Sequence, residues 1–201
     1  MNQQINLTAL ILAAGSSSRM GRFKPLLNYK GTTFIESIIT NVSTVCQNIA
    51  IVTGCNSAEL TSFIKEKYDL QKMNLSVVYN QEFEKGMFSS LKRGVEEIKN
   101  SRFVLYHLVD QPNLPQSFYK KFTLNIKHEY DWIQPRFNNF KGHPIIFGER
   151  VINRILKSPE TSNLRDVSNY PEFSKYFWDC KYKEIHTDLD TPDDLKKLKQ
   201  E

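Results

Sequence analysis

Strand-length apolar runs alternate with helical periodicity along the first half of the chain, and this alternation restricts the fold more than any other feature. The apolar runs span residues 7–14, 48–54, 75–80 and 103–110. Helical spacing of apolar residues fills the intervals at 32–45, 57–67 and 86–98, and Pro115 suits the first turn of a further helix. Strands separated by helices pair side by side in parallel, with helices on both faces of the sheet. The sequence therefore predicts an α/β fold of three α/β/α layers, Rossmann-like, around a mostly parallel mixed sheet.

Two of the predicted helices begin at recognisable capping residues. Thr33 and Glu36 have the spacing of a capping box, in which each side chain satisfies a backbone N–H at the helix start. Thr191 as N-cap, Pro192 as first residue and Asp194 as third mark the start of the last helix. Residues 143–148 and 182–190 have strand character, and the second of these leads into that last helix. No linker, repeat or low-complexity segment divides the chain, so we expect a single domain over residues 1–201.

Composition and charge narrow the choice of partners. The net charge of +5 admits anionic ligands, but acidic residues interleave with the basic ones, so we expect no nucleic-acid partner. The first apolar run is too short to cross a bilayer and no cation precedes it, so we expect neither a membrane segment nor a signal peptide. Cys46, Cys55 and Cys180 are scattered without metal-ligand spacing, which suits a reducing cytoplasm. We expect a cytoplasmic protein that is a monomer or a weak oligomer.

The stretch LILAAGSSSRMGRFKPLL, residues 10–27, leads from the first predicted strand into a loop of small residues and cations. Ligands of open α/β sheets bind beyond the carboxyl ends of the strands, where this loop lies. Gly15 and the serines after it offer backbone N–H groups and hydroxyls to an oxyanion. Arg19 can bind phosphate oxygens through two N–H groups, and Lys24 supplies a movable charge. The loop is typical of a polyphosphate site; the alternative is a solvated basic loop.

Two named phosphate-binding motifs do not fit this loop. A Walker loop requires G-x-x-x-x-G-K-[ST], but five residues separate Gly15 from Gly21, and two more precede Lys24. The dinucleotide motif G-x-G-x-x-G requires glycine where Ser17 stands. The loop instead resembles the L-A-A-G-x-S-x-R-M-G-x-x-K signature of the nucleotidyltransferases that include molybdenum cofactor cytidylyltransferase. The resemblance continues in order through GMFSSLKRGV, LVDQP, GHPIIF and DLDTPDDL, and it implies a GT-A-like nucleotidyltransferase fold.

The same resemblance implies a nucleotide site and a metal site. Asp110, in LVDQP, is implied as a ligand of Mg²⁺, a hard ion that takes one or two protein carboxylates. Asp190, in the closing motif, is implied as the second ligand, and Asp188 competes with it. Other interpretations remain open, since Asp110 could cap a helix and Asp190 could be a turn residue before Thr191. The residues implied for nucleotide binding are Leu12, Ala13, Ala14, Gly15, Ser16, Ser17, Arg19, Lys24 and Ser90.

Further residues of these motifs have expected places. Ser90 lies in the first turn of a predicted helix, whose free N–H groups and dipole favour anions, whereas Met87 is expected in the core. Gln111 and His143 are expected on the acceptor side of the site, the latter through the family's G-H-P. His107, inside the fourth strand, is expected to be a buried and hydrogen-bonded residue.

Nucleotidyl transfer is the activity that the resemblance implies. An acceptor phosphate attacks the α-phosphorus of a nucleoside triphosphate and pyrophosphate leaves, with Lys24, Arg19 and Asp110 as catalytic residues and Mg²⁺ as cofactor. Ala14, where the guanylyl branch has glycine, favours CTP, and the acceptor is a phosphorylated small molecule, with molybdopterin cofactor as first candidate. Transfer to a sugar or polyol phosphate and a non-catalytic nucleotide-binding module remain as alternatives. We expect Lys24 to be an exposed loop residue whose replacement leaves the fold intact.

Overall fold

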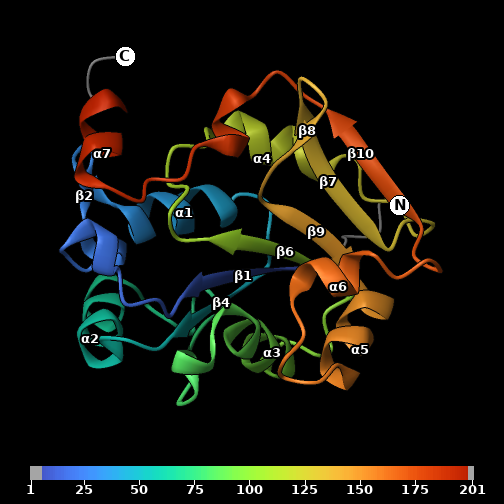
Figure 1. The fold of residues 1–201 in the computed structure, drawn as a ribbon. Helices are drawn as coiled ribbons and strands as arrows, with labels where there is room; N and C mark the ends of the chain where they lie inside the picture. Colours follow the sequence, from blue (N-terminus) through green and yellow to red (C-terminus); the bar gives the residue numbers. More distant parts are fainter. Residues whose placement is uncertain (1–5, 199–201) are drawn as a thin grey trace.

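A computed structural model describes residues 6–198 and shows one large twisted sheet (Figure 1). Its strands follow the order β10-β7-β9-β6-β1-β4-β5, and β8 pairs with β7 outside this path. Pairing is parallel from β6 through β1 and β4 to β5 and also between β7 and β10, whereas β9 runs antiparallel to β6 and β7. The expected mostly parallel mixed sheet is therefore confirmed. The strands are β1 (Leu7–Ala13), β4 (Asn48–Thr53), β5 (Leu75–Tyr79), β6 (Phe103–Leu108), β7 (Trp132–Phe137), β8 (Phe140–Lys141), β9 (Ile145–Gly148) and β10 (Lys175–Asp179), with a separate hairpin of β2 (Asn28–Tyr29) and β3 (Thr32–Thr33).

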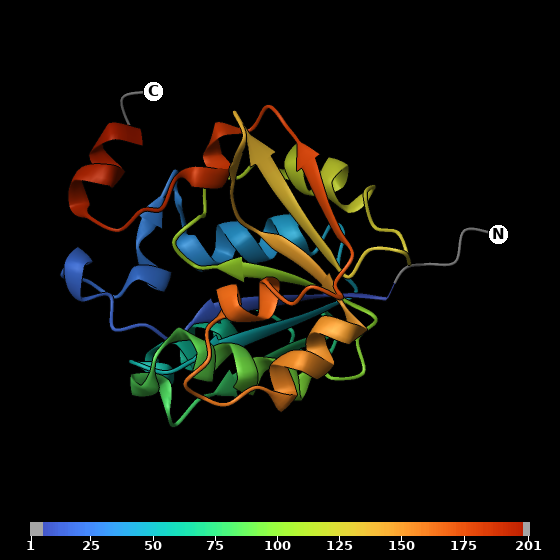
Figure 2. The same cartoon turned by 45° about the vertical axis from the view of Figure 1, so that its right-hand side comes forward.

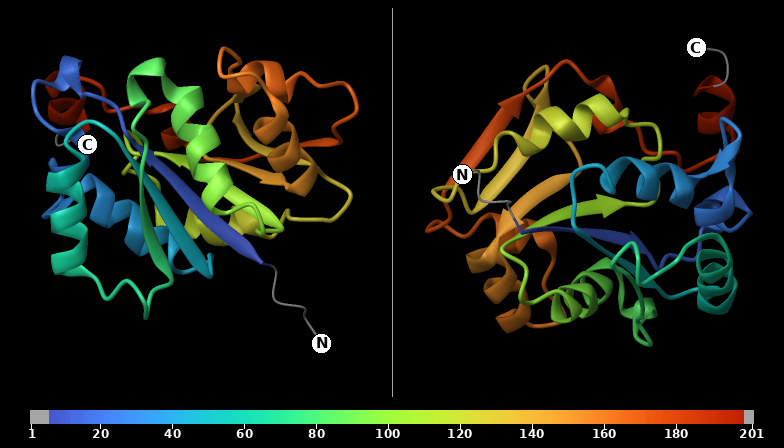
Figure 3. Two further views of the ribbon diagram at one scale, coloured as in Figure 1. Left: turned by 90° about the horizontal axis from the view of Figure 1, so that it is seen from below. Right: turned by 180° about the vertical axis from the view of Figure 1, so that it is seen from behind.

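Helices cover both faces of this sheet. In Figure 1, α1 and α4 lie on one side of β1 and β6, and α3 and α5 lie on the other. The view from below in Figure 3 shows α3 running across β1 and β4, and the view from behind shows α1 and α4 over the opposite face. The expected three α/β/α layers are confirmed. The helices are α1 (Phe34–Val42), α2 (Ser57–Lys67), α3 (Met87–Glu97), α4 (Gln116–Thr123), α5 (Glu149–Lys157), α6 (Leu164–Ser168) and α7 (Pro192–Leu198).

The central strand β1 shows why these layers form. Successive side chains of a strand point to opposite faces, and all seven residues of β1 are buried. Ala9 and Ile11 pack into the core under α1, α2 and α4, while Leu10 and Leu12 pack into the core under α3 and α5. Helix α3 approaches the sheet closely at Gly94, where a β-carbon would lie 2.6 Å from Leu10 Cδ1. The continuous apolar run seen in the sequence is thus the pattern of a strand covered on both faces.

Both predicted capping motifs are present. Thr33 Oγ1 accepts a hydrogen bond from Glu36 N, and the Glu36 side chain accepts one from Thr33 N at 2.9 Å. At the start of α7, Asp194 Oδ2 accepts from Thr191 N at 2.8 Å, and Thr191 Oγ1 accepts from Asp194 N at 3.3 Å. Local sequence therefore fixes where α1 and α7 begin.

The prediction of a strand over residues 182–190 is wrong. This segment contains a single 3-10 turn, η4 (Lys183–His186), followed by an extended loop, and the edge strand β10 lies earlier in the chain. The turn is held by a contact distant in sequence, because His143 N donates to Ile185 O at 3.1 Å. A β-carbon at Gly142 would lie 2.5 Å from that same carbonyl oxygen, so the two segments are in close contact. Figure 2 shows how far this twisted end of the sheet, with β7 and β10, is inclined to β6.

Within residues 6–198, no helix is both long enough and apolar enough to cross a bilayer.

Candidate active site

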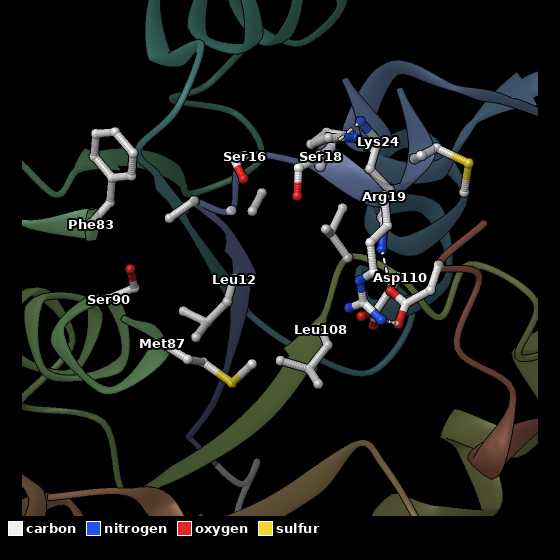
Figure 4. A pocket seen from close by; sticks show the side chains of 18 of the residues that line it. Leu12, Ser16, Ser18, Arg19, Lys24, Phe83, Met87, Ser90, Leu108 and Asp110 are labelled. Atoms are coloured by element: carbon white, nitrogen blue, oxygen red, sulfur yellow. Dashed lines mark hydrogen bonds and ion pairs between the residues drawn. The ribbon is translucent and has the colours of Figure 1, made fainter. Parts of the chain in front are cut away.

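A cleft with a volume of about 620 Å³ opens at the carboxyl ends of β1 and β6. Residues after β1 form one wall, residues at the end of β6 form the floor, and the start of α3 forms the opposite wall (Figure 4). The lining residues are Leu12, Ala13, Ala14, Gly15, Ser16, Ser17, Ser18, Arg19, Met20, Lys24, Pro25, Phe83, Glu84, Gly86, Met87, Ser90, Leu108, Val109, Asp110 and Asp190. The structure thus brings together all the residues that the sequence assigned to nucleotide binding, together with both of the aspartates proposed as metal ligands.

The loop after β1 is built from two short 3-10 turns. Ser17 takes a left-handed backbone conformation with φ of 55°, and Gly21 does so with φ of 66° after η1 (Ser18–Met20). Ser17 Oγ accepts a hydrogen bond from Lys24 N at 3.0 Å, which closes the loop before η2 (Lys24–Leu26). Gly15 has neither a positive φ nor a neighbour within 4 Å of the position of a β-carbon. The curvature of the loop therefore depends on Ser17 and Gly21 rather than on Gly15.

Two cations of this loop bind one carboxylate from the end of the chain. Lys24 Nζ lies 2.6 Å from Asp190 Oδ1, and Arg19 Nη1 lies 2.8 Å from Asp190 Oδ2. Lys24 is only 9% exposed, so the expectation of an exposed lysine is wrong. The Arg19 side chain, by contrast, is 73% exposed. Lys24 is therefore a buried, paired charge.

Asp110 faces the same region of the cleft. Burial raises its pKa to about 6, and the negative charges of Asp188 and Asp190 act in the same direction, against the attraction of Lys24. Asp110 Oδ1 is buried without a hydrogen-bond partner. The segment that carries the other two aspartates is fixed beside it, because Leu189 N donates to Asp110 O at 2.8 Å.

These carboxylates suit a hard cation. Two carboxylates brought together repel each other unless a cation lies between them, and Mg²⁺ takes one or two protein carboxylates and completes its shell with water and phosphate. Asp110 with Asp190 or Asp188 could offer such oxygen donors, although Asp190 now contacts Arg19 and Lys24. Among the described residues, no group of three or more His, Cys, Asp and Glu is arranged to hold a metal ion. The unpartnered Oδ1 of Asp110 is the atom that most clearly fits a metal ligand.

The other end of the cleft is largely apolar. Phe83, Met87 and Leu12 line it, and Figure 4 shows them on the side away from Arg19, Lys24 and Asp110. Met87 is 60% exposed, so the expectation that it belongs to the core is wrong. Helical spacing places Met87 on the same stripe as core residues, but it is the first residue of α3 and projects into the open cleft.

Residues 9–174 match the MobA-like NTP transferase domain, which is most of the chain. The chain belongs to the MobA-like NTP transferase family. It is accordingly a nucleotidyltransferase, as the motifs predicted, and a nucleoside triphosphate is one of its two substrates.

Relatives of this nucleotidyltransferase match between about two thirds of its length and nearly all of it. The molybdenum cofactor cytidylyltransferase of Escherichia coli strain K12 is 29% identical over 194 residues, which cover 96% of each chain. A probable molybdenum cofactor guanylyltransferase of Bacillus cytotoxicus is 26% identical over 130 residues, 65% of this chain and 62% of that protein. The crystal structure of Rv0371c from Mycobacterium tuberculosis, a complex with manganese, shares the fold with a TM-score of 0.70 at 18% identity, covering 96% of this chain and 97% of that one.

The apolar wall of this nucleotidyltransferase depends on residues that the motifs did not single out. Asn80 Nδ2 donates to Ser89 Oγ and to Ser90 Oγ, both at 3.0 Å, which fixes the first turn of α3 against the end of β5. Phe83 packs closely on the loop after β4, where a β-carbon at Gly54 would lie 2.5 Å from Phe83 Cβ. Asn80 is the first residue after β5, and Asp110 is the second after β6. A polar residue at the carboxyl end of a strand was therefore the signal that could have identified Asn80.

Three further residues that the sequence analysis singled out, Gln111, His143 and His107, lie outside the lining of the cleft. Gln111 is 1% exposed, and its amide contacts Asp188 rather than open space. His143 is half-buried, its Nδ1 has no hydrogen-bond partner, and burial lowers its pKa. His107 is fully buried, as predicted, with Nδ1 bonded to Leu108 O and Nε2 to Tyr119 Oη, both at 2.7 Å.

Proposed function

We propose that this nucleotidyltransferase transfers CMP from CTP to a phosphorylated small molecule, with Mg²⁺ as cofactor and pyrophosphate as the second product. The observation that carries the proposal is the division of the cleft into a charged end and an apolar end. Lys24, Arg19 and Asp110 form the charged end, which suits a metal-bound triphosphate. Phe83 and Met87 at the apolar end suit the flat faces of a base.

In this proposal the acceptor phosphate is the nucleophile. One of its oxygens forms a bond to the α-phosphorus, the bond to the bridging oxygen of the β-phosphate breaks, and pyrophosphate leaves with that electron pair. The nucleophile is already anionic, so no general base is required, and the rate depends on positioning and on neutralisation of charge. In this proposal Lys24 neutralises charge on the α-phosphate and on the leaving group, while Arg19 and the N–H groups of residues 15–18 hold the β- and γ-phosphates.

Asp110, with Asp190 or Asp188, would hold Mg²⁺. The chemistry that the bound ion supplies is neutralisation of charge on the triphosphate. Asp190 now contacts both Lys24 and Arg19, so triphosphate binding would exchange partners within this group: the cations move to phosphate oxygens and the carboxylate becomes available. In support, the solved Rv0371c structure, which shares this fold, is a complex with manganese.

We propose molybdopterin cofactor as the acceptor and His143 as a residue that contacts it. The support for the acceptor is the Escherichia coli relative, named molybdenum cofactor cytidylyltransferase and aligned over 96% of the chain. The support for His143 is its place in the G-H-P motif and its Nδ1, which is buried without a hydrogen-bond partner. Ala14 in the first motif supports a pyrimidine base, by likeness to the cytidylyl branch.

Two measurements test the proposal. Thermal shifts with each of the four nucleoside triphosphates and Mg²⁺ should be largest with CTP, and equal shifts with CTP and GTP would contradict pyrimidine selectivity. Pyrophosphate release should then require CTP, Mg²⁺ and molybdopterin together. Release with a sugar phosphate or polyol phosphate in place of molybdopterin would assign the acceptor differently. If the protein binds a nucleotide but releases pyrophosphate with none of these acceptors, the result would favour a nucleotide-binding module without catalytic activity.

A further inference from the structure

Gln111 is buried next to the charged end of the cleft and bonds to the segment that carries Asp188 and Asp190. Its Nε2 donates to Asp188 Oδ1 at 2.8 Å and to Ile185 O at 3.3 Å. Gln111 therefore bonds both to the backbone and to a carboxylate of a segment more than seventy residues away in sequence. A buried glutamine that binds a carboxylate in this way fixes the position of that carboxylate.

The orientation of this amide follows from its partners. Both groups that it contacts are acceptors, so the NH₂ group must face them, while Oε1 lies buried without a partner. The reverse orientation would place Oε1 of Gln111 against Asp188 Oδ1 and Ile185 O, which are both oxygen atoms. Neither the backbone bond nor the bond to Asp188 would survive that change.

Neighbouring backbone bonds hold the same segment. Leu189 N donates to Asp110 O at 2.8 Å, and His143 N donates to Ile185 O at 3.1 Å. These two bonds place the backbone of residues 185–189, but they do not orient the exposed Asp188 side chain. Gln111 bonds to that side chain directly, and without it the like charges of Asp110, Asp188 and Asp190 would favour conformations in which they lie further apart.

We propose that Gln111 is a positioning residue, which holds Asp188 and the segment leading to Asp190 so that their carboxylates face Asp110 before a metal ion binds. This inference rests on the metal site of the proposed function. Groups that orient metal ligands typically change metal affinity by about 10- to 100-fold when they are removed. Loss of the Gln111 amide should therefore lower the affinity for a metal ion without a comparable loss of folding stability.

The test is Mn²⁺ binding by the nucleotide-free protein, measured by electron paramagnetic resonance. Gln111→Met keeps the length and buried character of the side chain and removes the donor; we expect about tenfold weaker Mn²⁺ binding. If this variant fails to fold, Gln111→Asn retains an amide one methylene too short to reach and should show the same loss. Gln47→Met is the matched control, because that half-buried glutamine is also bonded to the backbone, accepting from Leu7 N at 2.9 Å, and it lies at the amino end of β1, away from the cleft.

A double-mutant cycle separates positioning from general structural support. If Gln111 acts through Asp188, the Gln111→Met substitution should have no further effect on Mn²⁺ affinity in an Asp188→Asn background. Unchanged Mn²⁺ affinity in Gln111→Met, or an equal loss in both backgrounds, would overturn the inference. If the wild type binds Mn²⁺ and releases pyrophosphate, the proposed function stands whatever these variants show. If the wild type binds no Mn²⁺, the metal site fails and this inference fails with it.

Discussion

Replacement of Lys24 by methionine should destabilise the fold, as well as remove activity. The change keeps an unbranched side chain of similar length and removes only the charge. The Lys24 side chain is 11% exposed and lies 2.6 Å from Asp190 Oδ1. Without it, Asp190 retains only the more exposed Arg19, and Asp110 loses the cation that lowers its pKa.

The size of the effect follows from this environment. Removal of one partner from a fully buried ion pair costs about 3–5 kcal/mol. Here the Asp190 side chain is partly exposed and keeps its contact with Arg19, so we expect a smaller loss of about 1–3 kcal/mol. In a chain of this length, 2 kcal/mol lowers Tm by about 4–8 °C.

The loss of folding stability caused by Lys24→Met should depend on pH. The folded-state pKa of Asp110 is about 6, above its ordinary value, so this carboxyl takes up a proton as the pH falls through 6. Protonation removes one of the like charges that Lys24 offsets. The destabilisation by Lys24→Met should therefore be largest near pH 8 and smaller at pH 5.

Thermal unfolding in EDTA at both pH values measures this effect. Lys65→Met, on the exposed face of α2, is the control and should change Tm little at either pH. A Tm for Lys24→Met equal to that of the wild type at pH 8, or an equal loss at pH 5 and pH 8, would refute the reasoning. Turnover within a factor of about three of wild type would show that Lys24 contributes well under 1 kcal/mol to the transition state.

Three further predictions concern the metal, pH and packing. Asp110→Asn should remove most Mg²⁺-dependent activity and Asp190→Asn less of it, because Asp110 carries the buried, unpartnered carboxylate oxygen and an amide oxygen at position 190 still ligates a hard cation; the reverse order in pyrophosphate release would contradict this. His107 has a folded-state pKa of about 4, below its ordinary value of 6.5, so the stability present above pH 6.5 is lost as the pH falls toward 4. Between pH 7.5 and pH 5, the free energy of unfolding measured in urea should fall by about 2 kcal/mol more in the wild type than in His107→Gln. Equal decreases in the two proteins would show that His107 does not cause the loss. Gly94→Ala should lower stability by about 1–3 kcal/mol because its methyl group meets the sheet, whereas Gly15→Ala has open space and should melt like the wild type.

Much of the fold could be predicted from the sequence because its determinants are local. Apolar periodicity identified β1 and α2, with the observed bounds of α2 equal to those predicted, and the Thr33–Glu36 box located the start of α1. Such signals depend on residues only a few positions apart, which the chain itself keeps close together. The motif after β1 likewise identified the loop that lines the cleft, because its serines and cations are neighbours in sequence.

Tertiary structure alone decided the remaining features. Lys24 and Asp190 lie 166 residues apart, and their ion pair exists because the loop after β1 and the segment before α7 meet beside β6. The segment before α7 is a 3-10 turn and a loop rather than a strand because Gly142 and Gln111 contact it, and neither contact is encoded locally. Sequence patterns report which residues can form a strand or bind an anion. Which carboxylate meets which cation depends on strand order, and strand order is a property of the packed sheet.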